Sequence, residues 1–326
     1  MDLFDRFEEI SITEIEGIKI GNAQNTIGGT GCTVIISEKG AVTGIDVRGG
    51  GPATRETDRL SPLCPLDKNH AIVLSGGSAF GLDASAGVMK FLEEQGIGYK
   101  TRVGIVPLVA GASIFDFGVG DSKTRPDKDM GYDACLNAYK NEFREGNCGV
   151  GTGATVGKFL GPGRMMKSGL GSYSVRFGEL IIGAVVVVNA LGDVYDIETG
   201  NILAGLQNED GTAIQGTISV LPDRLYDAND FYNENTTLGC VITNAQISNS
   251  EATKISAISQ NGLAKVIWPV HTSADGDAIF TMGTGTIKAD ANLIGPVASE
   301  VMAKAVNNAV RKTGPAYNLH CAGDFQ

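Results

Sequence analysis

The sequence has no long apolar run and no excess of positive charge. Its longest apolar stretch, 180–191, is shorter than the roughly 18 residues that a membrane helix needs, so it predicts a buried strand. Lys and Arg number 26 against 37 Asp and Glu, giving a net charge of −11 in 326 residues. A nucleic-acid surface needs clustered cations, so nucleic acid is excluded as a partner. Residues 1–9 lack the apolar core of a secretion signal, so we expect a cytoplasmic protein that does not bind membranes.

Patterns that hold metals or form disulfide frameworks are also missing. The six cysteines are scattered, with no CxxC motif and no histidine at short spacing. We therefore expect no metal, no cofactor and no disulfide framework, and most of these thiols should be small buried apolar groups.

Aromatic residues make up 6% and prolines number 10, whereas glycines number 45 and 42% of residues are hydrophobic. This balance indicates a globular chain with many tight turns. Short apolar runs between Ile10 and Val47 predict antiparallel strands. The glycines 49–51 then allow close backbone approach, either to a substrate or within a mobile turn.

Helices and further strands follow. Residues 71–74 predict a buried strand, and the helix after it should end at Gly96. Ser78 is interpreted as a cap of that helix, since a nucleophile elbow would need glycine where Phe80 stands. The remaining expected elements are a helix at 133–143, a helix opened by a capping box at 248–251, a strand at 278–282 and an amphipathic C-terminal helix with its apolar face at 297–310.

Two polar side chains stand out before the C-terminal third. The glycine-rich segment 149–159 imitates a phosphate-binding loop but has Thr152 and Phe159 at two required positions, so its Lys158 could instead lie against a reacting centre. Asn189 ends the apolar strand 181–188. Its amide could donate to a developing oxyanion, or it could form an Asx-turn.

The stretch 235–245 is the main candidate for the functional site. There a polar loop, 226–235, runs directly into an apolar strand that begins at Thr236. A cut before Thr236 would place a free α-amine, with a pKa of roughly 7.7 to 8.0, beside the threonine hydroxyl as its general base. The alternative is an ordinary loop-to-strand junction. Asp275 and Asp277 lie in a later turn, where they could be solvated or could orient an amine and a hydroxyl.

Three segments carry a family resemblance. They are Asn235-Thr236-Thr237 with Val241 to Asn244, Pro269 to Thr272 with Asp275-Gly276-Asp277, and Ala298 to Met302. Together they resemble the DmpA family of self-cleaving aminopeptidases and amidases, and most closely its nylon-oligomer hydrolase branch.

The resemblance implies an α/β fold in which two β-sheets are sandwiched between helix layers, often assembled as a tetramer. It implies one domain, 1–326, cut between Asn235 and Thr236 into an α chain (1–235) and a β chain (236–326). Thr236 would be the nucleophile, Lys158 would support it and Asn189 would stabilise the oxyanion. Asp275 and Asp277 would orient the amine and hydroxyl of Thr236.

The implied substrates are small peptides, amino-acid amides or ω-amino-acid oligomers. Several relatives carry tyrosine where Phe115 stands, so a role for that phenol is absent or supplied elsewhere. The resemblance does not imply that only substrates with a free amine end are cleaved. The family members that act as aminopeptidases can be serine enzymes, whereas the expected nucleophile here is a threonine. Acyl transfer to an amine, as in self-cleaving ornithine acetyltransferases, and a non-catalytic binding protein are the alternatives.

Overall fold

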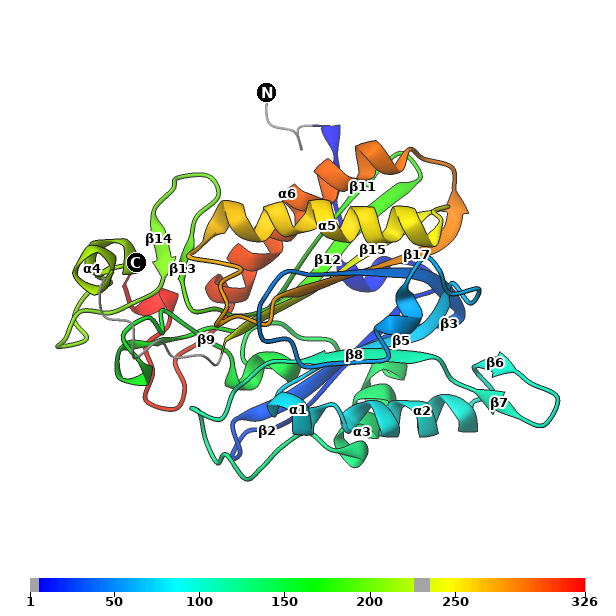
Figure 1. Cartoon of the computed structure of the whole chain (residues 1–326), viewed down its shortest axis with the longest axis horizontal. Coiled ribbons are helices and arrows are strands. Elements are labelled where there is room, and N and C mark those ends of the chain that lie inside the picture. The colour runs from blue at the N-terminus through cyan, green and yellow to red at the C-terminus, as the bar shows by residue number, and fades with distance from the viewer. Residues whose placement is uncertain (1–5, 226–234, 326) are drawn as a thin grey trace.

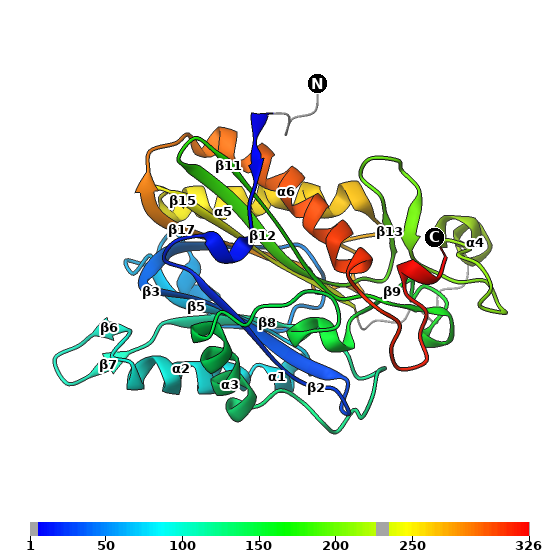
Figure 2. The ribbon, with the colours of Figure 1, turned by 180° about the vertical axis from the view of Figure 1, so that it is seen from behind.

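The computed structural model describes residues 6–225 and 235–325. Four layers are stacked, with helices α5 (Asn249–Val266) and α6 (Ala291–Arg311) outside one half of the β-structure and α2 (Ala84–Glu94) and α3 (Lys128–Tyr139) outside the other (Figure 1). Figure 2 shows the same layers from behind, with α6 crossing β11 and β12. This is the helix–sheet–sheet–helix order that the family resemblance implies.

The half beneath α5 and α6 contains β11 (Leu170–Phe177), β12 (Leu180–Asn189), β15 (Thr236–Ala245) and β17 (Ala278–Ile287). Strand β12 is antiparallel to β11 and β15, whereas β15 and β17 run parallel. Nearly every residue of β12 is buried, because helices cover one face and the second half-sheet covers the other. The predicted buried strand at 180–191 is confirmed.

The other half contains β2 (Lys19–Asn25), β3 (Thr30–Val47), β5 (Lys68–Ser75) and β8 (Val109–Ser113). The apolar runs expected as separate strands within 30–47 form one strand. Its first part pairs with β2 and β5, and its last part pairs with β17. The pairing shifts between Ile36 and Ala41, where Gly40 has φ +72°, so β3 bends there and joins both halves by hydrogen bonds.

The three interior layers are filled by apolar side chains. Side chains of β12, β15 and β17 pack on α5 and α6, and those of β3, β5 and β8 pack on α2 and α3. Between the two half-sheets lies a third core that includes Ile35, Leu74, Val187, Leu238 and Phe280. The sheets are therefore held together by burial as well as by β3.

Two local predictions need correction. The helix expected at 133–143 begins at Lys128, because Asp127 accepts hydrogen bonds from the backbone of Asp129 and Met130 and caps it. Ser78 is not a cap: it lies inside the short helix α1 (Ser78–Gly81) with φ +52° and makes no capping hydrogen bond. The predicted helix end at Gly96 is confirmed by its φ of +71°.

Shorter elements complete the chain. The strands are β1 (Glu8–Glu9), β4 (Thr54–Arg55), β6 (Tyr99–Lys100), β7 (Ile105–Val106), β9 (Thr155–Val156), β10 (Met166–Lys167), β13 (Asp193–Tyr195), β14 (Ile202–Ala204) and β16 (Ile267–Trp268). The helices are α4 (Thr217–Arg224) and the 3₁₀ turns η2 (Ile12–Glu14), η3 (Asp58–Leu60), η4 (Gly149–Gly153), η5 (Pro162–Arg164) and η6 (Ala322–Asp324). Across the described ranges, none of the helices has both the length and the apolar character to span a bilayer.

Candidate active site

Thr236 is the first residue of β15 and faces Asn189, the last residue of β12, across the antiparallel ladder. Both side chains are buried, at 4% and 0% exposure. The predicted strand after the polar loop is confirmed, although residues 226–234 of that loop lie outside the described residues. A hydroxyl is thus held at the edge of the core, as the sequence indicated.

The peptide bond between Asn235 and Thr236 has two donors on its carbonyl oxygen. Thr236 Oγ1 donates to that oxygen at 2.5 Å, and the backbone N–H of Gly276 donates to it at 2.8 Å. Donors aimed at a carbonyl oxygen favour negative charge there. This bond is therefore polarised next to the hydroxyl that would attack it.

Glycines bring the 272–277 turn close to Thr236. A β-carbon on Gly276 would lie 2.7 Å from Thr236 Oγ1, and one on Gly49 would lie 2.3 Å from the backbone nitrogen of Asp277. Such distances leave no room for a side chain. The close approach predicted for glycines 49–51 therefore serves the chain's own 272–277 turn.

The carboxylate of Asp275 is buried and saturated with donors. It accepts from the hydroxyl of Thr272 at 2.6 Å, from the backbone of Thr272 at 3.0 Å and from the backbone of Leu191 at 3.4 Å. Burial, followed by repulsion from Asp277, raises the pKa of Asp275. This aspartate ties the turn to the end of β12.

Asp277 is equally buried. Its Oδ1 accepts from the backbone N–H of Thr237 at 2.7 Å, and its Oδ2 lies 2.9 Å from Nδ1 of His271 and accepts from the His271 backbone at 3.1 Å. The solvated-turn alternative is excluded for both aspartates. Within the described residues neither carboxylate hydrogen-bonds Thr236, although Asp277 accepts a hydrogen bond from the backbone N–H of Thr237, the next residue.

Lys158 and Asn189 form a buried pair. Lys158 Nζ donates to the side-chain oxygen of Asn189 at 2.9 Å and to its carbonyl at 3.1 Å. The backbone of Thr155 also donates to that side-chain oxygen, at 3.1 Å, while Asn189 Nδ2 donates to the carbonyl of Phe115 at 2.9 Å. The Asx-turn alternative is excluded, because the Leu191 N–H that it requires is directed at Asp275.

The glycine-rich segment before Lys158 does not form a phosphate cradle. Residues 149–153 form a fully buried 3₁₀ turn, and a β-carbon on Gly151 would lie 2.3 Å from the Gly146 carbonyl. The segment instead delivers Thr155 and Lys158 to Asn189.

A second buried cation, Lys167, was missed in the sequence. Its Nζ donates to the carbonyls of Gly151 at 2.9 Å, Ala154 at 3.0 Å and Ser168. Burial lowers its pKa to about 7. Lysine in a polar-looking stretch normally predicts a surface position, so only the flanking apolar Met165 and Met166 gave any signal.

Lys167 has an electrostatic partner in Asp116. Burial raises the pKa of Asp116 to about 6, although hydrogen bonds from Thr30 Oγ1 at 2.6 Å and the Gly77 N–H at 2.8 Å oppose the shift. These two groups support the segments that carry Thr155 and Phe115 beneath Asn189.

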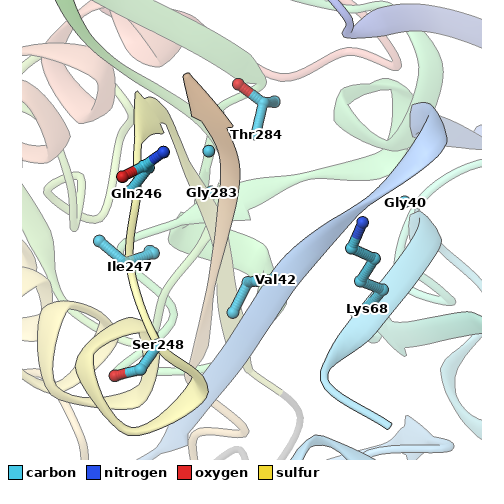
Figure 3. A pocket seen from close by; sticks show the side chains of 9 residues that line it. Gly40, Val42, Lys68, Gln246, Ile247, Ser248, Gly283 and Thr284 are labelled. Atoms are coloured by element: carbon cyan, nitrogen blue, oxygen red, sulfur yellow. The ribbon is translucent and has the colours of Figure 1, made fainter. Parts of the chain in front are cut away.

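Other features of the described residues lie away from this centre. No cluster of three or more His, Cys, Asp or Glu side chains that could hold a metal ion occurs within 6–225 and 235–325. A cavity of about 530 Å³ lies at the opposite end of β15 from Thr236, lined by residues that include Lys68, Gln246, Ser248 and Thr284 (Figure 3). It contains none of the predicted catalytic residues.

Solved structures identify the fold. A β-aminopeptidase of a Burkholderia species superposes with a TM-score of 0.69 at 15% identity, covering 95% of this chain and 89% of its own. The L-aminopeptidase D-Ala-esterase/amidase of Ochrobactrum anthropi gives 0.69 at 17% identity, covering 93% and 86%, and is described as a variant of the Ntn (N-terminal nucleophile) hydrolase fold. The fold of this chain is that of the Ntn hydrolases.

Sequence comparisons identify the family. The model of peptidase family S58 matches residues 11–316, and the chain belongs to that family. A Mycobacterium leprae protein described as an uncharacterized aminopeptidase is 38% identical, covering 88% of this chain and 82% of its own. A 6-aminohexanoate-oligomer endohydrolase of Kocuria sp. strain KY2 is 32% identical, covering 91% and 85%. The chain is therefore a hydrolase of amide bonds.

Proposed function

We propose that the chain cuts itself between Asn235 and Thr236 and that Thr236 is then the nucleophile of an amidohydrolase. The observation that carries this proposal is the geometry of the 235–236 peptide, whose carbonyl oxygen accepts both the Thr236 hydroxyl and the Gly276 N–H. Both residues are buried, so the nucleophile works in a site from which water is largely displaced.

Self-cleavage begins when Thr236 Oγ attacks the carbonyl carbon of Asn235. The Gly276 N–H stabilises the oxyanion, the C–N bond breaks, and the nitrogen of Thr236 takes up the hydroxyl proton. The resulting ester joins Asn235 to Thr236 Oγ. Water then hydrolyses the ester, leaving a carboxylate on Asn235 and a free amine and hydroxyl on Thr236.

In the mature enzyme the α-amine of Thr236 accepts the hydroxyl proton as Oγ attacks the substrate amide. Protonation of the leaving amine ends the acylation half, and water releases the acid from the acyl-threonine. Asp277, which binds the N–H of Thr237, borders the new amine and orients it; Asp275 fixes the same turn.

Asn189 is the proposed oxyanion donor. Its Nδ2 donates to the Phe115 carbonyl in the uncut chain and would exchange that acceptor for the oxyanion. Lys158 donates to the other end of the same amide, which strengthens the N–H as a donor because hydrogen bonds in a chain polarise one another. Lys158 therefore supports the nucleophile through Asn189.

The proposed substrates are small peptides, amino-acid amides and ω-amino-acid oligomers. This proposal is supported by the descriptions of two relatives, one an uncharacterized aminopeptidase and the other a 6-aminohexanoate-oligomer endohydrolase. Acyl transfer to an amine is the competing reaction. Release of free acid from such an amide with no acceptor amine present would distinguish hydrolysis from transfer.

The first prediction concerns Thr236→Ala. It should give one uncut polypeptide on a denaturing gel and no amidase activity in a hydrolysis assay, because self-cleavage and substrate hydrolysis both lose their nucleophile. Thr237→Val is the matched control: the Thr237 hydroxyl is buried and has no hydrogen-bond partner in the described part of the chain. That variant should be cut and active. An uncut but fully active Thr236→Ala protein would refute the proposal.

We also propose a homotetramer in the cytoplasm. The family resemblance supports the assembly, and the free thiols of Cys32, Cys135 and Cys240 within the cores fit a reducing compartment. Light scattering during size-exclusion chromatography would test the subunit number.

A further inference from the structure

Four residues form an aromatic shelf beside the candidate active site: Phe80, Phe115, Phe117 and Arg125. Phe115 and Phe117 follow β8, Phe80 belongs to α1, and Arg125 lies just before α3. Phe80 is 61% exposed, while the other three are half-buried. An exposed phenylalanine that joins two more rings presents an apolar surface to solvent.

The cation of Arg125 lies over this surface. Its guanidinium carbon is 3.8 Å from the ring centre of Phe80 and 5.0 Å from that of Phe117. The rings of Phe115 and Phe117 are 4.6 Å apart. A guanidinium stacked on aromatic faces is held in place while its edge keeps hydrogen-bond donors directed outward.

Arg125 has no carboxylate partner within the described residues. Its Nε donates to the carbonyl of Ser122 at 3.2 Å. The acids nearby are engaged elsewhere, since Asp121 accepts from Lys123 and Thr124, and Asp127 caps α3. In a chain of net charge −11, Arg125 is thus a positioned cation whose outer donors remain available.

The shelf adjoins the candidate active site through the backbone of Phe115. The carbonyl of Phe115 accepts the hydrogen bond from Asn189 Nδ2, and Asn189 is paired with Thr236. From Phe115 the surface continues through Phe117 to Arg125 in two steps, of 4.6 and 5.0 Å. Phe115 therefore contacts the proposed oxyanion donor through its backbone, and Arg125 lies beyond its ring.

We propose that the aromatic shelf is a substrate subsite in which Arg125 binds the terminal carboxylate of an oligoamide while the rings contact the apolar chain that precedes it. This inference rests on the proposed amidohydrolase function and names its substrate class. Arginine matches a carboxylate with two parallel donors. One carbon separates the amide from the carboxylate in an α-amino acid, which is too short for the two ring steps, so the shelf selects ω-amino-acid units with several methylenes.

The test compares one substrate in two forms, a linear 6-aminohexanoate oligomer with a free carboxylate and the same oligomer with that group converted to a carboxamide. Arg125→Gln should raise KM for the free acid about tenfold or more, leave its kcat nearly unchanged and leave both constants for the carboxamide unchanged. Lys123→Gln removes the same charge from an exposed position on the same loop. This control should leave all four constants at the parent values.

Three kinetic results would overturn the subsite. They are equal changes for acid and carboxamide in Arg125→Gln, no change for either substrate, and the same selective loss in Lys123→Gln. An altered subunit number in Arg125→Gln would also overturn it, because the shelf would then be a contact between copies of the chain. Failure of the parent protein to cut itself, or to hydrolyse any of the proposed amides, would instead reject the proposed function. A parent protein that hydrolyses amino-acid amides but neither oligomer would overturn the subsite alone.

Discussion

Gly276 occupies a position where the space beside Thr236 Oγ1 is limiting. A β-carbon there would lie 2.7 Å from both Thr236 Oγ1 and the Gly51 carbonyl oxygen, so Gly276→Ala must displace the N–H that donates to Asn235. We predict self-cleavage at least about tenfold slower, since loss of one such donor typically costs 10²- to 10³-fold in rate. The rate is measured as loss of the full-length band with time.

Gly51→Ala is the control for that variant. A β-carbon on Gly51 would meet nothing closer than the Asp275 carbonyl oxygen at 3.9 Å, which is ordinary contact. It should be cut at the parent rate. Equal rates for both variants would show that the Gly276 N–H does not assist the cut.

At the scale of single residues, the sequence indicated the site wherever a polar side chain stood at the end of an apolar run. Asn189 and Thr236 were found in this way, and the structure pairs them. The catalytic roles of these and of Lys158, Asp275 and Asp277 stay predictions. Lys167 could not be found, because its burial depends on the carbonyls of Gly151 and Ala154, which belong to one turn earlier in the chain, and on that of its neighbour Ser168.

Among the elements, strands with uniform apolar character were predictable, and the bend in β3 was not. Gly40 is one of many glycines, and only pairing with two different half-sheets shows that the strand continues through it. The end of α2 and the start of α5 were predicted because caps are local signals. The start of α3 was misplaced by five residues, since its first turn is polar.

Helix α5 provides a prediction at this scale. Ser248 and Glu251 form the reciprocal capping box, with the Ser248 N–H donating to Glu251 at 2.7 Å. Ser248→Ala should lower the free energy of unfolding by about 1 kcal/mol, which is the usual cost of losing an N-cap. Self-cleavage should be unaffected, because Thr236 lies at the other end of β15.

The effect of the cap is measured by thermal unfolding of the uncut Thr236→Ala protein with and without Ser248→Ala. Ser250→Ala is the control, since within the described residues this exposed hydroxyl hydrogen-bonds only Ser248 Oγ, at 3.2 Å. It should unfold within about 0.5 kcal/mol of the parent, as surface substitutions usually do. Equal destabilisation by both variants would mean that the cap contributes nothing specific.

For the whole molecule, the four layers followed from the family resemblance. The hydrogen bonds through β3 that join the two half-sheets did not.

The stability of the protein should depend on pH through Lys167. Burial lowers that pKa from 10.5 to about 7, so the unfolded chain binds the proton more tightly than the folded chain. The stabilising contribution is therefore lost as pH falls through about 7 and grows as pH rises from there toward 10.5.

We predict that uncut Thr236→Ala protein gains melting temperature between pH 7 and pH 9 and that adding Lys167→Met reduces this gain. Each unit of pKa difference corresponds to about 1.4 kcal/mol in the free energy of unfolding, so the two proteins should differ by a few kcal/mol in how that free energy changes with pH.

Asp116 acts at lower pH. Its pKa is raised to about 6, so its contribution to the free energy of unfolding is lost as pH rises from about 4 to 6.

Lys254→Met is the control for this pH series, because Lys254 is exposed on α5. Its curve should run parallel to that of the parent. If Lys167→Met also gives a parallel curve, the buried ammonium does not control the alkaline side of the stability profile.

The burial of the 235–236 peptide has one more consequence. Asn235 and Thr236 are 2% and 4% exposed, and the N–H on their shared carbonyl comes from a turn that precedes β17, the parallel neighbour of β15. Other proteases cannot reach this bond in the native state, and a nascent or misfolded chain lacks the neighbouring turn that donates to it. Under the proposed self-cleavage, only correctly folded molecules would be cut, so the fraction of cut chains in a preparation would equal the fraction that had folded.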